Sequence, residues 1–441
     1  MIDFIVFKFF SILISLCLLK YSFLLKRLNG DIHTPGSLYS FYWFLFTFFP
    51  IIFLFFVPIN PLPLLYILIS AIAFSISSFH YDWKLIKKIN DKSHFFDLKS
   101  LDNKFLKIVF YLSFICSILF PLLMLIQNGF NLELFLLDWA STSSRFATTR
   151  ANDGYEYGLI GQLSTFFPLF VAALGSAISF TTNIKSKKIT YFILSLLPAL
   201  IFMLFHSSKI IFLYAIVFYI SVLISLKLYL GFNEILSKVA IKSIFIFLIF
   251  FSPILLLTFT LREGYNDLSN DIFLPTILSY LFGSIYAFSD FFMSILGLGS
   301  QSIYLVENNY SLGYYSFKSL FDFLGGTKVF PPGYYYDFYN YNNYIQTNIF
   351  TFFRQLIQDF GILGSLLFIY IMGVILNFNY YLILKIRKPY LSLTIFIIFL
   401  VFLGMSQMFN IFTTRLSLMV ALSLYLIFKL NCIKLSKKSN R

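Results

Sequence analysis

Residues 347–364 combine charged and polar side chains with the start of an apolar helix, and they offer the best candidates for chemistry in the chain. Arg354 and Asp359 lie five residues apart, where a Tyr-rich polar segment gives way to apolar residues. Charges at the edge of a membrane are costly unless they face a partner or a cavity. A guanidinium can bind phosphate through paired hydrogen bonds, and a carboxylate can accept a proton or orient the arginine. The alternative is an interfacial arginine that extends towards lipid head groups.

The elements that must position these charges are membrane helices. The chain has 441 residues, of which 59% are hydrophobic and only 12% charged. A soluble domain has about twice that charged fraction. The three cysteines lie in or beside apolar segments without the spacing of metal ligands, and Lys8 and Lys20 in the first apolar segment favour a span over a removed signal peptide. The composition therefore predicts an all-α polytopic membrane protein.

About 20 apolar residues are needed for each membrane-spanning helix. This criterion predicts about eleven spans (10–12), with one large outer loop that contains helices at the membrane interface, all within a single integral membrane domain, residues 1–441. The expected spans are 2–25, 38–57, 62–80, 105–126, 159–182, 190–206, 210–230, 243–260, 355–376, 390–409 and 413–430. The apolar stretch 272–298 is interrupted by Pro275, Gly283 and Asp290, and it must cross the membrane either zero times or twice.

Lysine-rich and lysine-poor loops alternate along the chain. The lysine-rich set, which includes 81–104, 183–189 and 379–389, is expected in the cytoplasm by the positive-inside rule. The short loops between spans also account for the net charge of +14, so the charge does not indicate nucleic-acid binding. The two long loops, 127–158 and 261–354, are then on the outer side.

Arginines are distributed differently from lysines. Most lysines are on the expected cytoplasmic side, whereas five of the eight arginines are on the outer side: Arg145, Arg150, Arg262, Arg354 and Arg415. Orientation signals alone would not separate the two residue types. Because arginine binds phosphate and carboxylate in a bidentate manner, this set predicts an anion site. Chance among so few residues is the alternative, and for Arg145 and Arg150 a solvated cap over the helices is an equal one.

Further candidates lie beside these arginines. His206 and Lys209 form a short outer turn between two expected spans, and Glu263 follows Arg262 directly. Residues 304–344 are rich in tyrosine and asparagine, including Tyr334, Tyr335 and Tyr336. Aromatic faces and amide groups suit sugar rings, although an interfacial aromatic belt or a biased composition would look the same.

Several chemistry-bearing motifs are absent from the sequence. It contains no H-E-x-x-H, Walker A or G-x-S-x-G motif, and its outer loops have no Asp-x-Asp pair. We therefore expect no metal and no cofactor. The lack of an evident internal repeat weakens the case for an inverted-repeat transporter.

The pattern Thr347-Asn348-Ile-Phe-Thr351, then Arg354, Asp359-Phe360-Gly361 and Gly364, resembles the Wzy-type O-antigen polymerases, which join oligosaccharide repeat units in bacterial inner membranes. Two more features agree: Thr34-Pro35-Gly36 before the second span, and Ser207-Ser208-Lys209, where many relatives carry arginine. The general plan of spans and one large outer loop extends the resemblance over nearly the whole chain.

The resemblance implies a transfer at the periplasmic face between two glycans linked to undecaprenyl diphosphate. A hydroxyl of the incoming unit attacks the anomeric carbon of the growing chain, and the lipid diphosphate leaves. Arg262, Arg354 and Arg415 are then expected to stabilise the diphosphate, with Glu263, Asp359 or His206 as base or as partner of an arginine. Membrane lipid and a chain-length regulator are the other implied partners.

Two other functions are compatible with these residues. An O-antigen ligase would use the same donor with the lipid A core as acceptor, and a flippase for lipid-linked oligosaccharides would transport the substrate instead.

The loop pattern predicts the topology directly. A reporter fused after Ser93 or Asn183 is expected in the cytoplasm, and one fused after Tyr310 on the outer side. Paired alkaline phosphatase and green fluorescent protein fusions measure this. A cytoplasmic signal at Tyr310 contradicts the eleven-span arrangement.

Overall fold

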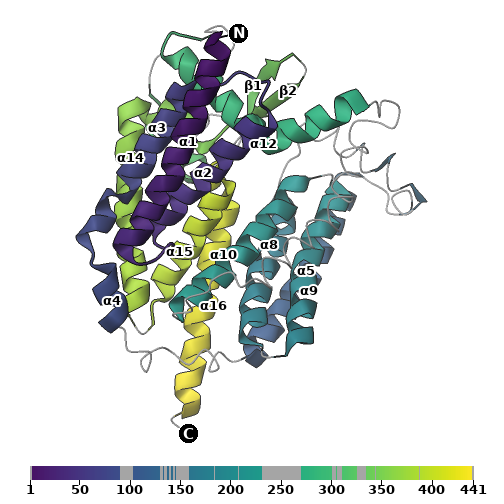
Figure 1. The fold of residues 1–441 in the computed structure, drawn as a ribbon. Coiled ribbons are helices and arrows are strands. Elements are labelled where there is room, and N and C mark those ends of the chain that lie inside the picture. The colour runs from purple at the N-terminus through teal and green to yellow at the C-terminus, as the bar shows by residue number, and fades with distance from the viewer. Residues whose placement is uncertain are drawn as a thin grey trace. The chain divides into compact units, whose positions relative to one another are not determined.

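The structure is a computed structural model, and it describes residues 2–89, 103–129, 133, 137–138, 141–142, 145, 158–182, 184–206, 208–230, 270–299, 304, 310–324, 334–342, 344–386 and 388–439. The chain divides into two compact units. The first unit comprises Met1–Asp91, Ser269–Ile386 and Phe402–Arg415, and the second comprises Lys92–Leu268, Arg387–Val401 and Leu416–Arg441. Figure 1 shows the helices and strands of both units.

Within the described residues, nine helices are long and apolar enough to cross a membrane. The chain is therefore an α-helical polytopic membrane protein, as its composition predicts. Seven expected spans coincide with α1 (Ile2–Asn29), α2 (Pro35–Phe53), α3 (Pro61–Ser75) with the 3₁₀ helix η1 (Ile76–His80), α5 (Asn103–Gln127), α8 (Leu159–Thr181), α9 (Lys185–His206) and α10 (Lys209–Tyr229). The expected span 243–260 lies outside the described residues.

Local sequence signals explain where the first helices begin. α2 begins at Pro35 after Thr34, and α3 begins at Pro61 after Asn60, whose side chain accepts a hydrogen bond from the Leu62 amide at 2.9 Å. Proline fits the first position of a helix, and asparagine is a strong N-cap. A short helix, α4 (Trp83–Ile89), follows η1.

Polar contacts and close backbone approach hold the helices of the first unit together. The Tyr66 and Ser365 hydroxyls share a hydrogen bond of 2.6 Å between α3 and α14, and the Asn377 amide donates to Ser77 at 2.8 Å. A Cβ added at Gly373 in α14 would collide with the carbonyl oxygen of Phe74. Membrane helices associate through such small residues and interhelical hydrogen bonds because lipid supplies little hydrophobic driving force.

α14 (Phe352–Lys385) is two helices joined at a kink. Gly361 has φ 71° and ψ 179° inside it, a conformation that other residues seldom adopt. A short segment before Gly361 carries Arg354 and Asp359. The longer segment after it covers most of the expected span 355–376, whose first residues lie before the kink. The kink therefore separates the charged turn from the membrane-spanning part.

α12 (Asn270–Ile295) is one continuous helix, although the sequence predicts a break at Pro275, Gly283 or Asp290. Ile277–Ile295 is long and apolar enough to span. Its contacts lie at one end of the neighbouring helices: the Phe282 ring stacks on Phe53 at 5.4 Å, and the Tyr286 hydroxyl donates to the Leu54 carbonyl at 3.0 Å. Further along α12, the ring of Phe292 contacts that of Tyr66 near the start of α3, with the ring centres 5.2 Å apart. This pattern favours a helix that lies across the ends of α2 and α3.

Beside α12 lies a two-stranded antiparallel hairpin, β1 (Tyr334–Tyr341) and β2 (Ile345–Ile349). The Tyr-rich part of the expected outer loop thus contains strands, which a purely helical prediction does not include. Ser279 joins α12 to β2 by accepting from the Gln346 amide at 3.0 Å. Figure 1 shows the hairpin next to α12, at the end of the unit where α1 begins. A short helix, α13 (Lys318–Phe323), precedes it in sequence.

In the second unit, α5, α9 and α10 pack around α8, most of whose residues are buried. The Ser176 hydroxyl of α8 donates to the Tyr219 carbonyl of α10 at 2.7 Å, and Phe120 of α5 stacks on Phe167 at 5.4 Å. α15 (Tyr390–Met405) is only 16 residues long, and α16 (Arg415–Ser439) follows the 3₁₀ helix η4 (Ile411–Thr413). Both α15 and α16 have residues in each unit.

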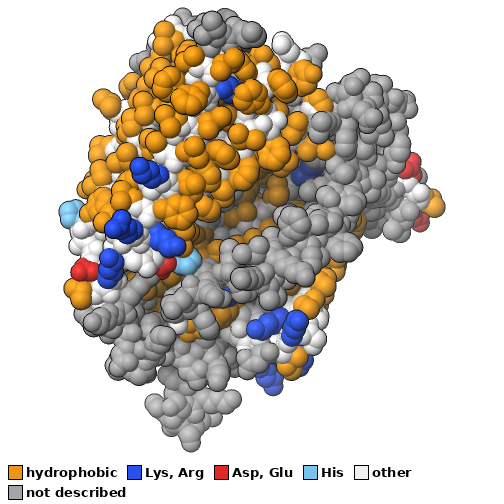
Figure 2. Space-filling view, in the orientation of Figure 1, with side chains coloured by type: hydrophobic (Ala, Val, Ile, Leu, Met, Phe, Trp, Pro, Cys, Tyr) orange, Lys and Arg blue, Asp and Glu red, His pale blue; other side chains and the backbone are white. Residues whose placement is uncertain are grey.

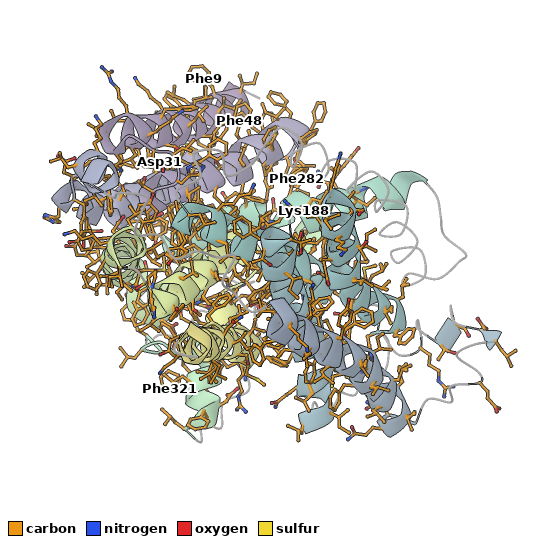
Figure 3. All side chains as sticks on the ribbon, turned by 90° about the horizontal axis from the view of Figure 1, so that it is seen from below. Phe9, Asp31, Phe48, Lys188, Phe282 and Phe321 are labelled. Atoms are coloured by element: carbon orange, nitrogen blue, oxygen red, sulfur yellow. The ribbon has the colours of Figure 1, made fainter. Side chains whose placement is uncertain are left out.

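Apolar side chains cover the outer face of α1, as expected for contact with lipid. Phe9 is 63% exposed and points away from the helices, as Figure 3 shows. Figure 2 shows basic side chains near the end of this unit where α4 lies, and the last turn of α1 contains Lys26 and Arg27. Asp31, labelled in Figure 3, is in the turn between α1 and α2 and pairs with His33 at 2.6 Å.

The close approach at Gly373 predicts a test of the helix packing. Gly373→Ala should lower the free energy of unfolding by about 1–3 kcal/mol, because the added methyl group must displace the end of α3. Thermal unfolding in detergent or nanodiscs measures the loss. Gly158→Ala is the matched control, since no atom lies within 4 Å of its Cβ position. Equal stability of both variants would contradict the packing of α14 on α3.

Candidate functional site

Arg354 is almost completely buried at the start of α14, with 1% of its surface exposed. Its Nη2 donates to a carboxylate oxygen of Asp337 in β1, a side chain that is itself only 5% exposed. Removing two charges from water is costly, and a direct pair recovers much of that cost. The pair therefore ties the hairpin to the first turn of α14.

Four aromatic rings surround the guanidinium. The Arg354 Cζ lies 3.5 Å from the ring centre of Tyr335, 4.1 Å from Phe350, 4.8 Å from Phe291 and 5.3 Å from Tyr304. Aromatic faces attract a desolvated cation. Burial raises the pKa of Tyr335, and the positive charge of Arg354 opposes that shift. The expected sugar-binding face of Tyr335 is thus occupied by an arginine.

The guanidinium has further donors that the described residues do not use. Within that part of the chain, Nε and Nη1 of Arg354 have no hydrogen-bond acceptor, and Oγ1 of Thr351 and Oε1 of Gln355 also have no partner. Thr351, Arg354 and Gln355 are three and four residues apart, so they lie on one side of the helix start. Buried polar atoms without hydrogen-bond partners destabilise the folded state, so binding of water or a small anion to these atoms would be favourable.

Asp359 is held by a loop rather than by Arg354. The Ser311 hydroxyl and the Tyr315 amide both donate to its Oδ1, the amide at 2.9 Å, and the Ser316 amide donates to its Oδ2 at 2.7 Å. The side chain is fully buried. Both oxygens are therefore occupied, which favours a structural role over the expected one as base or partner of Arg354.

A cleft of about 520 Å³ opens next to the aromatic rings, between the hairpin, α12, the start of α1 and the α2–α3 turn. Its lining is more apolar than polar. The lining residues are Phe4, Phe7, Pro58, Ile59, Asn60, Tyr286, Ser289, Asp290, Met293, Phe338, Tyr339, Asn340 and Tyr341. This size and mixture suit a small hydroxyl-rich group at a membrane surface.

Asp290 connects the cleft to the arginine. Its Oδ2 accepts a hydrogen bond of 2.6 Å from Tyr304, one of the four rings around Arg354. Burial, then the hydrogen bond and the charge of Asp290, raise the pKa of Tyr304, so that phenol remains a donor. Behind the cleft, Lys8 is buried and donates to the Tyr286 hydroxyl at 3.2 Å and to the Leu54 carbonyl at 3.1 Å.

The other predicted site residues are distributed over both units. Arg415 is exposed at the start of α16, and the segment before it packs on α14, where the Phe352 amide donates to the Ser406 carbonyl at 2.9 Å. Tyr334 and Tyr336 belong to β1, but their side chains lie outside the described residues. Arg150, Arg262 and Glu263 also lie outside the described residues.

In the second unit, His206 ends α9 and Lys209 begins α10, and both side chains are buried. The His206 ring stacks on Phe202 at 4.4 Å. Arg145 is exposed, and like His206 and Lys209 it has contacts with other residues. His206 and Lys209 therefore lie at adjoining helix ends in the second unit, whereas Arg354 belongs to the first.

The structure adds three residues that the sequence interpretation did not select, Asp337, Asp290 and Tyr304. Asp337 lies in a run of aromatic and polar residues without an apolar alternation, so nothing identified it as a strand residue facing inwards. In the sequence, Asp290 is only an interruption of an apolar stretch. Alternation could not have found Asp337, because the register of β1 on β2 shifts between Tyr334 and Tyr339.

The ion pair predicts a characteristic stability pattern. Asp337→Ala or Arg354→Ala should each lower the unfolding free energy by about 3–5 kcal/mol, because either leaves a buried charge without its partner. The double variant Arg354→Met with Asp337→Leu should recover most of this loss. Unfolding in SDS-containing mixed micelles provides the measurement.

The control is the partly buried pair Lys318–Asp322 on α13, joined at 2.7 Å. Asp322→Ala should cost about 0.3–0.5 kcal/mol, as is typical of pairs four residues apart on a helix. Single variants at Arg354 and Asp337 that are as stable as this control would show that the pair does not hold the hairpin.

The site thus combines a buried cation with spare donors, an acidic cleft and aromatic walls. Within the described residues, no group of three or more His, Cys, Asp or Glu side chains could hold a metal ion. Comparison of the chain with protein families, with curated proteins and with solved structures gives no match.

Proposed function

We propose that this chain is a glycosyltransferase of the bacterial inner membrane that polymerises oligosaccharide repeat units linked to undecaprenyl diphosphate. The growing glycan is transferred to the non-reducing end of the next lipid-linked unit at the periplasmic face. The product is O-antigen or a related surface polysaccharide. The observation that carries the proposal is the placement of Arg354, at the start of a membrane helix, beneath a Tyr-rich hairpin and beside a polar cleft.

The motif that resembles the Wzy-type polymerases supports the same reaction. Arg354 and Asp359 of that motif lie on the short helix before the Gly361 kink, and Thr347 and Asn348 lie on β2. Asn348 donates to the Tyr335 carbonyl at 3.1 Å and so helps to position the hairpin. The motif is therefore one continuous piece of structure around Arg354.

The chemistry requires positive charge where the diphosphate leaves. Fixed donors that point at a developing negative charge are among the strongest contributions to catalysis. Nη2 of Arg354 donates to Asp337. Its Nε and Nη1 atoms have no acceptor among the described residues, so in this proposal they donate to the leaving diphosphate. Arg262 and Arg415 supply further charge in this proposal, and no metal takes part.

The topology in this proposal has the amino terminus, the α2–α3 turn and the hairpin in the periplasm. The eleven spans then leave the lysine-rich loops in the cytoplasm, with 127–158 and 261–354 outside. α12 lies at the outer interface, because its contacts gather at the ends of α2 and α3. A chain-length regulator in the same membrane is the protein partner that we propose.

The test is polymerisation by the purified full-length chain. Lipid-linked single repeat units, isolated from a strain that lacks this gene, should become a ladder of longer lipid-linked glycans in excess EDTA. Arg354→Lys should slow this by about 10²–10³-fold, because a point charge does not replace the guanidinium fork. Arg27→Lys, exposed in the last turn of α1, is the matched control and should keep the full rate.

Other outcomes identify the alternatives. A single transfer to the lipid A core indicates a ligase, and movement of intact units across vesicles without bond formation indicates a flippase. Loss of the ladder in EDTA with recovery in Mg²⁺ or Mn²⁺ contradicts the arginine mechanism. An Arg354→Lys variant with full activity would indicate simple charge steering instead of bidentate binding.

A further inference from the structure

We propose that the cleft binds the terminal sugar of the acceptor unit and that Asp290 accepts the proton of its attacking hydroxyl. The inference rests on the proposed polymerase function, and it assigns one of the two substrates, the acceptor unit, to the cleft. It concerns residues outside the 347–364 motif, namely Asn60, Ser289, Asp290, Tyr339 and Asn340.

The lining of the cleft suits a sugar attached to a lipid. Asn60, Ser289, Asn340 and the tyrosine hydroxyls offer donors and acceptors, and the rings of Tyr339 and Tyr341 can contact the C–H face of a sugar. Phe7, on the same lining, is 43% exposed on the lipid-facing helix α1. A headgroup could therefore enter the cleft while its lipid chain stays in the membrane.

Charge decides which substrate fits. The lining residues include no Lys or Arg, and their one formal charge is the carboxylate of Asp290. Lys8 lies behind Tyr286, whose hydroxyl accepts its hydrogen bond. A diphosphate in this cleft would meet a like charge, whereas a neutral, hydroxyl-rich sugar would not. The acceptor sugar therefore fits the cleft, and the donor diphosphate fits the arginine.

Asp290 has the geometry of a proton acceptor. Tyr304 occupies its Oδ2 at 2.6 Å, and no described residue donates to its Oδ1. The side chain is partly exposed to the cleft, in contrast to the fully buried Asp359. Tyr304 contacts both Asp290 and the guanidinium of Arg354, so the acceptor and the leaving group would lie on either side of one phenol ring.

The bonds and the proton in this step balance. The acceptor oxygen forms a bond to the anomeric carbon of the donor glycan as its proton moves to Oδ1 of Asp290. The bond between that carbon and the diphosphate oxygen breaks, and the lipid diphosphate leaves with the electron pair near Arg354. Asp290 then returns its proton to solvent through the open cleft.

Asp290→Asn is the direct test in the purified full-length chain with lipid-linked repeat units. It removes the proton acceptor but keeps the shape and a hydrogen-bond acceptor for Tyr304. The turnover rate should fall by about 10²–10⁴-fold, with a much smaller change in the KM for the acceptor unit. Asp290→Glu should recover part of the rate, and Asp322→Asn on α13 is the matched control that should leave it unchanged.

Asn340→Ala provides a second test that does not depend on Asp290. Asn340 is exposed on the hairpin, so its replacement should not unfold the protein. The variant should raise the KM for the acceptor unit about tenfold while the turnover rate stays near that of the wild type. A synthetic repeat oligosaccharide without lipid diphosphate should inhibit the wild type, and inhibit Asn340→Ala more weakly.

The outcomes separate this inference from the proposed function. If the wild-type chain makes no polymer, the proposed function fails, and the cleft assignment fails with it. If the wild type polymerises while Asp290→Asn and Asn340→Ala have wild-type kinetics, the function stands and the cleft assignment is overturned. A larger effect of Asn340→Ala on the KM for the donor chain would also overturn it.

Discussion

The buried pair between Arg354 and Asp337 is the interaction on which the hairpin end of the first unit depends. A guanidinium with 1% of its surface exposed cannot remain charged there without compensation, and one carboxylate and four aromatic rings provide it. Because Asp337 belongs to β1 and Arg354 to α14, the same contact that neutralises the charge also docks the hairpin. This one pair therefore restricts the movement of Tyr335 and Tyr304, and it positions the aromatic wall between Arg354 and the cleft.

A second constraint acts on the other side of the same short helix. Asp359 binds the amides of Tyr315 and Ser316, and Gly361 turns the chain through a positive φ directly afterwards. Tyr310 packs so closely on Gly361 that a Cβ there would lie 2.8 Å from its ring. The charged residues of the motif therefore have different roles: Asp359 and Gly361 fix the direction of the short helix, and that direction holds Arg354 beneath the hairpin.

These constraints separate two electrostatic environments within a short distance. The guanidinium with its spare donors is positive, and the cleft beyond Tyr304 has a carboxylate and no basic lining residue. The proposed reaction, which expels an anion from one sugar and takes a proton from another, would use both environments. Tyr304 contacts both Asp290 and Arg354, so its aromatic ring separates the two environments.

The sequence by itself determined that the chain crosses a membrane and where eight of its long apolar helices lie, because lipid demands long apolar segments whose backbone bonds are satisfied internally. It also located Arg354, since an arginine beside an apolar helix is costly enough to be noticed. Its partner could not be predicted in the same way. Asp337 is 17 residues from Arg354, on a strand whose aromatic and polar residues carry no apolar alternation. Only the tertiary structure decided that Arg354 pairs with Asp337, that Asp359 accepts hydrogen bonds from the loop at 311–316, and that Asp290 lines a cleft. The reason is that side-chain partners depend on which segments fold against one another.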